Sequence, residues 1–370
     1  MHKGRILHVS SARSWRGGEQ QLLYLVEELT KLGYQQAVYC VEGSELQKRL
    51  SGTEPGVFTY YKKSAVSLSA AGRLNSAIRD FQPDLIHCHD SHSHTMAYIA
   101  GFSGKNIPLV ISRRVDFYTG QSMLSRRKYN NSRVKAIVCV SNVIAEMMKE
   151  TIKDHSKIRV VYSGVDLSRF TNISAPGLLR SEYNIPDDEV LIGNVAALAP
   201  HKDYFTFLDT AAMLIEGGLN ARFLIVGDGH EKLAIARYCN KLTLGNHVIF
   251  TGFRKDIPQV LSNLDLVLMT SKTEGLGTSI IDALASGVPV VSTNAGGIPE
   301  IIEHGINGLL GSIKNPTELM QCVRRMLAEP ELRDACVENG KQTARNFSKE
   351  NMAAGTAEIY RELIVSDPAQ

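Results

Sequence analysis

Two carboxylates stand eight positions apart in the segment TEGLGTSIIDALASGVPVV, which spans residues 273–291. Asp282 falls where the apolar spacing predicts the first turns of a helix, and Ser279 with Asp282 approximates a capping box. Capping by Thr278 or Ser279 therefore accounts for this helix end, although Asp282 can also bind a ligand. Glu274 has no capping role, because it lies in a glycine-punctuated turn after a strand. We predict that Glu274 faces a ligand, and that replacing it costs less than about 1 kcal/mol of stability, as at a surface position.

Three other loops of the second half carry groups suited to a phosphorylated ligand. Lys202 follows a strand in APHKDY and can reach a diphosphate as a point charge, although it is also one of 41 basic residues. Gly227 lies in the strand-end turn VGDGHEK, where the missing side chain permits a close approach to the backbone. In TGFRKDI, Phe253 or Arg254 can stack on a flat base.

A glycine pair follows the first predicted strand, in SWRGGEQQ. Gly17 and Gly18 lie in a turn before a helix, whose N-terminal amides and dipole can hold a phosphate or a sugar oxygen. Many ordinary turns between a strand and a helix also carry glycines. The spacing differs from G-x-G-x-x-G, which argues against a dinucleotide site.

Four histidines crowd the segment DLIHCHDSHSH, residues 84–94, which we predict to be a strand running into a loop. The density suggests a metal site, but recognised zinc spacing is absent and Asp90 is the one acid that lies between the histidines. We therefore expect no metal here. One or two of these side chains, with His89 as the candidate, are expected to line a cleft as hydrogen-bond donors.

Arginines follow the strand in SRRVDF and recur in SRRK. Adjacent residues of a strand point to opposite faces, so one of Arg113 and Arg114 can enter a cleft while the other pairs with an acid such as Asp116. Arg126 and Arg127 continue the basic character. This region suits an anionic acceptor or a membrane surface, and equally an ordinary solvated loop.

The bulk composition is that of a globular protein. The chain has 370 residues, 44% of them hydrophobic and 21% charged, and it contains no apolar run long enough for a membrane span or a signal peptide. Six cysteines without a C-x-x-C pair predict buried free thiols and a cytoplasmic protein. Residues 1–170 hold 24 Lys or Arg against 14 Asp or Glu, and the remainder holds 17 against 24. A basic first half suits an anionic ligand or surface, or is simply solvated.

Short apolar runs alternate with helical patterns along the whole chain, which predicts parallel sheets covered on both faces. The expected fold is α/β, with two Rossmann-like domains facing each other across a cleft that holds the active site. Domain one spans residues 1–170 and domain two spans 171–349. A C-terminal helix, about 350–367, is expected to pack back on domain one. The strands are predicted at 5–10, 35–41, 84–89, 108–115, 136–141, 190–198, 221–229, 247–253, 264–271 and 289–293.

These motifs, in this order, resemble the GT-B fold nucleotide-sugar glycosyltransferases of glycosyltransferase family 4. The resemblance covers essentially the whole chain and is strongest from about 160 to 312. SGVDLSRF resembles the family's segment at the domain junction, and VAALAPHKD resembles its G-R-L-x-x-x-K-G loop. The segment TEGLGTSIIDALASGVPVVSTNAGGIPEIIEHGINGLL resembles its E-x7-E signature and the tail that follows.

The resemblance implies a role for each matching residue. Glu274 would contact hydroxyls of the transferred sugar, Asp282 the ribose hydroxyls, and Lys202 the diphosphate. The backbone amides of Leu276, Gly277 and Thr278 would hold the distal phosphate. The base would be held by Phe253 and Arg254. The glycine loop of the first domain would be formed by Gly17 and Gly18.

Three departures from the family pattern affect the implied chemistry. Asp282 replaces the usual Glu, which shortens its reach by one methylene. Ala197 stands where many members have the Arg that partners the Lys. Arg113 or Arg114 stands where many members have a His, and Arg remains protonated, so it cannot act as a base. It can instead hold a phosphate or carboxylate of an acceptor.

The implied reaction is metal-independent sugar transfer, with retained configuration, from a nucleoside diphosphate sugar to an acceptor hydroxyl. A UDP-sugar is the expected co-substrate, no further cofactor is expected, and nucleic acid is not an expected partner. The segments SRRVDF and SWRGGEQQ are similar to segments of family members that build bacterial surface polysaccharide or lipopolysaccharide core, at the inner face of the membrane. Three alternatives remain: a nucleotide-sugar epimerase or hydrolase of the same fold, an NAD-dependent dehydrogenase, and a catalytically silent binding protein.

Overall fold

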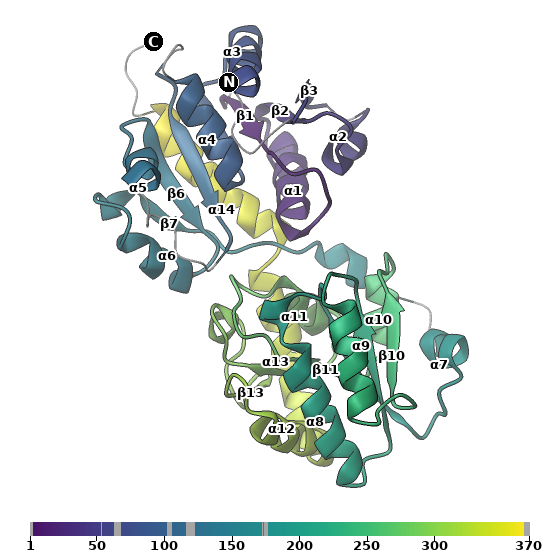
Figure 1. Ribbon diagram of the computed structural model, residues 1–370. Coiled ribbons are helices and arrows are strands. Elements are labelled where there is room, and N and C mark those ends of the chain that lie inside the picture. The colour runs from purple at the N-terminus through teal and green to yellow at the C-terminus, as the bar shows by residue number, and fades with distance from the viewer. Residues whose placement is uncertain are drawn as a thin grey trace. The chain divides into compact units, whose positions relative to one another are not determined.

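A computed structural model describes residues 3–52, 54–62, 68–101, 106–115, 123–171, 173 and 177–365 (Figure 1). Asp116, one of the predicted acceptor-side residues, lies outside these ranges. The chain forms two compact units, which are described separately below. Unit 1 comprises Met1–Gly164 together with Lys349–Gln370, and unit 2 comprises Val165–Ser348.

Unit 1 is built on a seven-stranded sheet whose neighbouring strands all run parallel. Its five inner strands are rich in Val, Ile and Leu and are buried along most of their length, as expected for a parallel sheet covered on both faces, whereas its two edge strands are mostly half-buried or exposed. In spatial order the strands are β3 (Gly56–Tyr60), β2 (Gln35–Val41), β1 (Arg5–Val9), β4 (Leu85–Cys88), β5 (Leu109–Arg113), β6 (Val134–Cys139) and β7 (Ile158–Val160).

Helices cover this sheet, and the last helix of the chain returns to it. Helix α14 lies against α1 (Figure 1). Tyr34, in the loop after α1, donates a hydrogen bond from its hydroxyl to the backbone oxygen of Ala357 over 3.2 Å, and Tyr360 is completely buried. The helices of unit 1 are α1 (Gly17–Lys31), α2 (Glu45–Leu50), α3 (Leu68–Phe81), α4 (Ser91–Ala100), α5 (Met123–Tyr129), α6 (Asn142–Lys149) and α14 (Lys349–Val365).

Unit 2 repeats this plan with a six-stranded parallel sheet. In spatial order its strands are β10 (Val248–Gly252), β9 (Ala221–Val226), β8 (Val190–Val195), β11 (Leu266–Met269), β12 (Val290–Thr293) and β13 (Leu309–Gly311). Its helices are α7 (Leu178–Tyr183), α8 (Tyr204–Glu216), α9 (Lys232–Lys241), α10 (Ile257–Ser262), α11 (Thr278–Ala285), α12 (Pro316–Ala328) and α13 (Pro330–Asn346), and short 3₁₀ turns lie at Leu167–Phe170 and Pro200–Lys202.

Each sheet has one point where the chain reverses the direction in which it adds strands. In unit 1 this topological switch lies between β1 and β4, and in unit 2 it lies between β8 and β11. In open α/β sheets the loops at the carboxyl ends of the two switch-point strands diverge and leave room for a ligand. The loops after β1, β4, β8 and β11 are therefore the places where the fold can hold a site.

Several local predictions are wrong. The His-rich segment is a helix after Asp90, not a loop, because the Asp90 carboxylate caps α4 by accepting hydrogen bonds from the backbone amides of His92 and Ser93. Gly17 and Gly18 are the first residues of α1, not turn residues before it. The apolar periodicity did not predict α4, because the apolar stripe of this helix is weak. It also did not predict β3, the strand that follows the short helix α2.

Two further observations concern the composition. All six cysteines are free and buried, as predicted. Among the residues that the structure describes, no helix has the length and apolar character that crossing a membrane requires.

Candidate functional site

Lys202 and Glu274 meet at the switch point of unit 2. Lys202 ends the 3₁₀ turn that follows β8, and Glu274 lies in the loop that follows β11, so neighbouring strand ends bring the two loops together. The Lys202 ammonium forms a close ion pair with Oε1 of Glu274, and only 14% and 9% of the two side chains are exposed. Ser271 donates a second hydrogen bond to the same carboxylate oxygen over 2.8 Å.

The expectation that Glu274 occupies a surface position is therefore wrong. It is buried and paired, and removing one partner of a buried ion pair typically costs about 3–5 kcal/mol, because the other charge is stranded. A variant that preserves the size of the side chain is a better test of its function than Ala.

The backbone around Glu274 is fixed by a close contact with the loop after β12. Gly297 donates its amide to the backbone oxygen of Glu274 over 3.0 Å. Gly296 has a positive φ of 53°, and a Cβ at that position would lie 2.0 Å from the same oxygen. Only glycine permits this approach, so the N-A-G-G segment holds the Glu274 turn in place.

A second ion pair satisfies the neighbouring lysine. Lys272 lies 3.2 Å from a carboxylate oxygen of Asp203, which is almost completely buried. Thr270 donates to the backbone oxygens of Lys202 and Asp203 over 3.2 and 3.0 Å. The loops after β8 and β11 are thus joined by backbone contacts as well as by charges, which makes the position of Lys202 a property of the fold.

Asp282 lies in the second turn of α11, and the capping interpretation is wrong for it. The N-cap is Gly277, which takes the left-handed conformation with φ of 98°, and within the described residues no side chain caps this helix. Thr278 is simply the first helical residue. Burial raises the pKa of the Asp282 carboxyl to about 7, although the Arg169 guanidinium opposes the shift. An acid held at this cost without a capping role suits a ligand-binding position.

The remaining predicted donor-loop residues divide into exposed and inward-facing groups. Leu276 points into the core, whereas the ring of Phe253 is 68% exposed. Arg254 is engaged by Asp256 and Glu182, and these hydrogen bonds raise the pKa of its guanidinium. It is therefore held beside the Phe253 loop and is not free to move onto a base.

The requirement for glycine at position 227 comes from a contact within the chain itself. Its φ is 145°, and a Cβ there would lie 2.1 Å from the backbone oxygen of Ala196. The close approach that the sequence suggested is made by the loop after β8. Ala197, which replaces the Arg of many family members, is exposed in that same loop.

The switch point of unit 1 holds a chain of hydrogen bonds with defined direction. A guanidinium only donates, so Nδ1 of His89 accepts from Arg114 over 3.3 Å. Nε2–H of His89 then donates to Nδ1 of His8 over 3.0 Å, and Nε2–H of His8 donates to Gln36 over 3.0 Å. Gln36 completes the chain by donating to the backbone oxygen of Val26.

Burial keeps these histidines neutral. It lowers the pKa of His8 to about 4 and the pKa of His89 well below the ordinary value, with the nearby positive charge of Arg114 adding to both shifts. Burial also lowers the pKa of the Arg114 guanidinium to about 10, against the opposing effect of Glu19 and Asp90. Arg114 therefore remains charged at neutral pH, whereas the chain behind it carries no charge.

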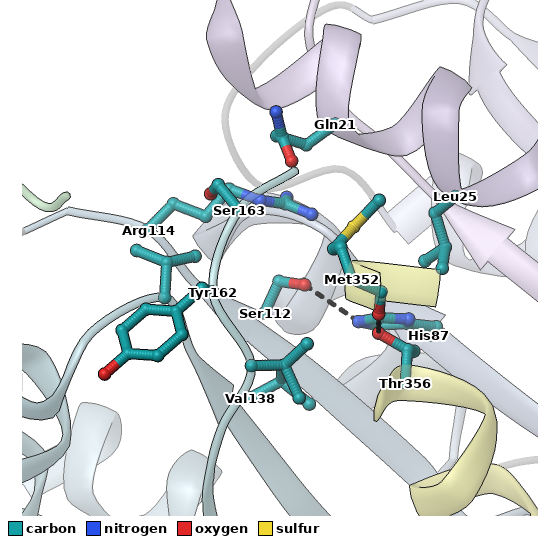
Figure 2. A pocket seen from close by; sticks show the side chains of 12 residues that line it. Gln21, Leu25, His87, Ser112, Arg114, Val138, Tyr162, Ser163, Met352 and Thr356 are labelled. Atoms are coloured by element: carbon teal, nitrogen blue, oxygen red, sulfur yellow. Dashed lines mark hydrogen bonds between the residues drawn. The ribbon is translucent and has the colours of Figure 1, made fainter. Parts of the chain in front are cut away.

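A third buried histidine borders a small pocket next to this chain. His87 is hydrogen-bonded through Nδ1 to the Tyr360 hydroxyl over 2.5 Å, and through Nε2 to Ser112 over 2.8 Å. Figure 2 shows the dashed bond between His87 and Ser112, with Gln21 and Arg114 on the pocket wall. The pocket is enclosed largely by the sheet, α1 and α14.

His8, His87 and His89 lie close enough to be considered as a metal cluster, with one nitrogen of each within 4.8 Å of the others. Every ring nitrogen of the three already has a hydrogen-bond partner. A metal ion would have to replace those bonds, so the donor set fits a structural hydrogen-bond chain better than a metal site.

The other predicted residues of unit 1 do not converge on this pocket. Arg113 is buried within β5, and Arg126 and Arg127 are exposed on α5. A Cβ at Gly17 or Gly18 would meet open space, so nothing in the described chain requires glycine there.

Sequence reasoning missed Ser271, Gly296, Arg169 and Tyr360. The first two lie within or beside the recognised motif, and their residue types gave a signal: a hydroxyl next to the strand end, and paired glycines. Arg169 and Tyr360 gave none, because they reach Asp282 and His87 only through the packing of distant segments.

Comparison with known proteins covers most of the chain. Residues 178–343 match the family described as glycosyl transferases group 1, and residues 15–169 match glycosyltransferase family 4. The chain is 23% identical over 317 residues to the N-acetyl-alpha-D-glucosaminyl L-malate synthase of Bacillus anthracis, covering 84% of this chain and 83% of that protein. It is also 23% identical over 354 residues to the lipopolysaccharide core biosynthesis glycosyltransferase LpsE of Rhizobium meliloti, covering 95% and 96%.

Two solved structures have a similar fold. A glycosyltransferase from Rickettsia africae matches with a TM-score of 0.86 and 23% identity, over 98% of this chain and 99% of that one. Anabaena HepE, in complex with UDP and glucose, matches with a TM-score of 0.84 and 22% identity, over 96% of this chain and 98% of that one. The predicted architecture of two Rossmann-like domains is confirmed.

Proposed function

Because the chain belongs to the GT-B fold glycosyltransferases of the family 4 type, we propose that it transfers a sugar, with retained configuration, from a nucleoside diphosphate sugar to an acceptor hydroxyl. The observation that carries this proposal is the Lys202–Glu274 ion pair at the switch point of unit 2. A cation and a carboxylate in contact there match the needs of a diphosphate and a sugar on one donor.

Unit 2 is the donor-binding part in this proposal. Lys202 and the uncapped N-terminal amides of α11 bind the diphosphate, since a helix N-terminus and an ammonium both favour negative charge. Glu274 accepts hydrogen bonds from the transferred sugar, and Asp282 accepts them from the ribose. The exposed ring of Phe253 stacks on the base, uracil by preference, while Arg254 holds that loop.

The transfer step conserves atoms and charge without a covalent enzyme intermediate. The acceptor oxygen forms a bond to the anomeric carbon on the face from which the phosphate leaves, and the bond between that carbon and the phosphate oxygen breaks. The leaving phosphate oxygen takes the proton of the acceptor hydroxyl. Lys202 and the α11 amides stabilise the negative charge that develops on the diphosphate. Because these groups supply positive charge, we propose that the reaction is metal-independent, and the rate should be unchanged after treatment with EDTA.

Unit 1 is the acceptor-binding part, and Arg114 indicates that the acceptor is anionic. Two N–H groups of Arg114 donate to His89, and among the described residues the rest of the guanidinium has no protein acceptor. A guanidinium of this kind can bind a carboxylate or phosphate with two parallel hydrogen bonds. The proposed acceptors are saccharides or glycolipids of bacterial surface polysaccharide or lipopolysaccharide-core assembly.

Helix α5 supports peripheral contact with a membrane that carries such an acceptor, on its cytoplasmic side. Met123 and Leu124 are 88% and 79% exposed, and the exposed side chains of Arg126 and Arg127 follow within one turn. Apolar side chains beside cations suit an anionic bilayer surface. Replacing Met123 and Leu124 together by Ser should reduce sedimentation with phosphatidylglycerol vesicles, while vesicles of phosphatidylcholine alone should bind neither protein.

A panel of nucleotide sugars tests the main proposal. The protein is incubated with each donor and with a set of carboxylated, phosphorylated and neutral saccharide acceptors, and release of nucleoside diphosphate is followed. Transfer should require one donor, and NMR of the product should show the anomeric configuration of that donor. Isomerised donor would support an epimerase, hydrolysis alone a hydrolase, and binding without turnover a silent binding protein. Any of these three results would overturn the proposed transfer.

A further inference from the structure

The Lys202–Glu274 pair has a consequence for ligand exchange, which rests on the donor-binding role proposed above. Both members are assigned to one donor, yet in the protein alone they are bound to each other. The donor diphosphate and the Glu274 carboxylate therefore compete for the same cation, which is the Lys202 ammonium. When the donor binds, its diphosphate replaces Glu274 as the partner of Lys202 and does not bind to an unpaired cation.

The pair is held together by the fold and not by chance contact between flexible side chains. The Glu274 backbone is fixed by Gly296 and Gly297, and its carboxylate receives a further hydrogen bond from Ser271. The Lys202 backbone is tied to the loop after β11 through Thr270. Both side chains are mostly buried, so neither is well solvated when the pair opens.

The neighbouring lysine cannot easily replace Lys202 in this exchange. Lys272 is engaged with Asp203, which also accepts a hydrogen bond from Thr206 over 2.8 Å. Opening that pair would strand an acid that is almost fully buried and lies at the start of α8. The Lys202–Glu274 pair is thus the one that a ligand can open at lower cost.

We infer that Glu274 is an internal competitor of the diphosphate, and that this makes the site selective for an intact nucleotide sugar over a nucleoside diphosphate. An intact donor places its phosphate on Lys202 and offers its sugar hydroxyls to Glu274, so both members of the pair gain new partners. A nucleoside diphosphate takes Lys202 and leaves the Glu274 carboxylate without a counter-charge. After transfer, Glu274 recovers Lys202 and displaces the product.

The inference predicts an effect of unusual sign. Glu274→Gln removes the competing charge but keeps the size of the side chain, so it should bind pyrophosphate and UDP more tightly than the unmodified protein. An increase of about tenfold corresponds to about 1.4 kcal/mol, a moderate share of what a buried pair can contribute. Affinity for UDP-glucose should not increase, because the same change removes a hydrogen-bond acceptor for the sugar.

Calorimetric titration with pyrophosphate, UDP and UDP-glucose tests this inference. Pyrophosphate is included because it probes the anion site without regard to the base. Lys202→Met should lose pyrophosphate binding. Glu189→Gln is the matched control, because it breaks the Arg222–Glu189 ion pair of the same unit at the opposite end of β8; it should leave all three affinities unchanged. Glu274→Asp, which shortens the acid, should tighten pyrophosphate binding by about threefold and serves if the Gln variant folds poorly.

An unchanged or weaker affinity of the Gln and Asp variants for pyrophosphate would overturn the inference. So would equal pyrophosphate binding by the Lys202→Met variant. Failure of the proposed function looks different: no nucleotide sugar of the panel would be transferred, while pyrophosphate binding would still respond to Glu274 and Lys202.

Discussion

The two switch points of this protein solve the same structural problem with different electrostatics. In unit 1, His8 and His89 form a neutral hydrogen-bond chain that ends on Arg114. In unit 2, Lys202 and Glu274 form an ion pair. Both arrangements bring together groups from strand ends that are distant in sequence, and both are largely buried.

The difference shows which partners each site can exchange. Removing a hydrogen bond from the histidine chain leaves a buried donor or acceptor unsatisfied, so the chain is suited to holding Arg114 in one position. A ligand anion can replace Glu274 on Lys202, provided that the same ligand also offers hydrogen-bond donors to the released Glu274 carboxylate. The neutral chain therefore suits a fixed recognition element, and the ion pair suits a site that opens and closes in each turnover.

The largest expected effect concerns Glu274 itself. Glu274→Gln should lower the rate of sugar transfer by about 10² to 10³, because a preorganised contact to the reacting sugar is lost. Steady-state kinetics with the donor found in the panel measures this. Glu189→Gln should keep the full rate and lose comparable thermal stability. An equal loss of rate in both variants would make the Glu274 pair structural.

The second effect is acid sensitivity confined to unit 1. Because the pKa of His8 is about 4 when folded and about 6.5 when unfolded, the unfolded state binds more protons between these values. The contribution of neutral His8 to the free energy of unfolding is fully present above pH 6.5. It is lost as the pH falls, and at pH 5 this residue alone lowers the free energy of unfolding by about 2 kcal/mol. His87 and His89 shift in the same direction.

Amide hydrogen exchange at pH 7 and pH 5, corrected for intrinsic rates, measures this difference. Protection of β1 and β4 should fall by about 30-fold, which is the equivalent of 2 kcal/mol. Protection of β8 and β11 should not fall, because the raised pKa of Asp282 stabilises unit 2 as the pH decreases through this window. A uniform loss across both sheets would contradict the proposed contrast between the units.

The third effect is a pH dependence of nucleotide binding through Asp282. Its pKa of about 7 means that the carboxyl is largely protonated at pH 6, and ribose hydroxyls donate best to the ionised form. UDP affinity should therefore be about tenfold lower at pH 6 than at pH 8. Calorimetry on Asp282→Asn supplies the baseline for titration of the diphosphate itself. Identical pH profiles for both proteins would remove Asp282 from the site.

Stability should show the opposite sign for Asp282. Since its pKa is raised on folding, the folded state keeps a proton between about pH 4 and pH 7, and stability falls as the pH rises through that window. Asp282→Asn should consequently raise the melting temperature at pH 8 and have little effect at pH 4.

The smallest effect concerns Arg114. Arg114→Lys retains the charge but loses the planar fork, so the KM for an anionic acceptor should rise about threefold to fivefold while the KM for the donor stays constant. A neutral acceptor analogue should show no difference between the two proteins. A rise in the donor KM instead would place Arg114 on the donor.

Much of the fold followed from the sequence because parallel strands leave a strong pattern. Runs such as QQAVYCV, which forms β2, and VVST, which forms β12, are rich in apolar and β-branched residues, and helices separate such runs along the chain. The cap of α11 was misassigned because Thr278 and Ser279 are good capping residues in isolation. A glycine in the left-handed conformation at position 277 starts the helix one residue earlier and leaves both hydroxyls without that role.

By itself, the sequence determined the order of strands and helices, the loops that carry Lys202 and Glu274, and the family, because these depend on local periodicity and contiguous motifs. Only the tertiary structure decided that the two residues, 72 positions apart, bind each other. It also decided that the backbone of the loop after β8 lies against Gly227. It decided as well that His8 and His89 are neutral and that their hydrogen bonds have a defined direction. Strand order and burial set these features, and no local pattern records which loop lies beside which.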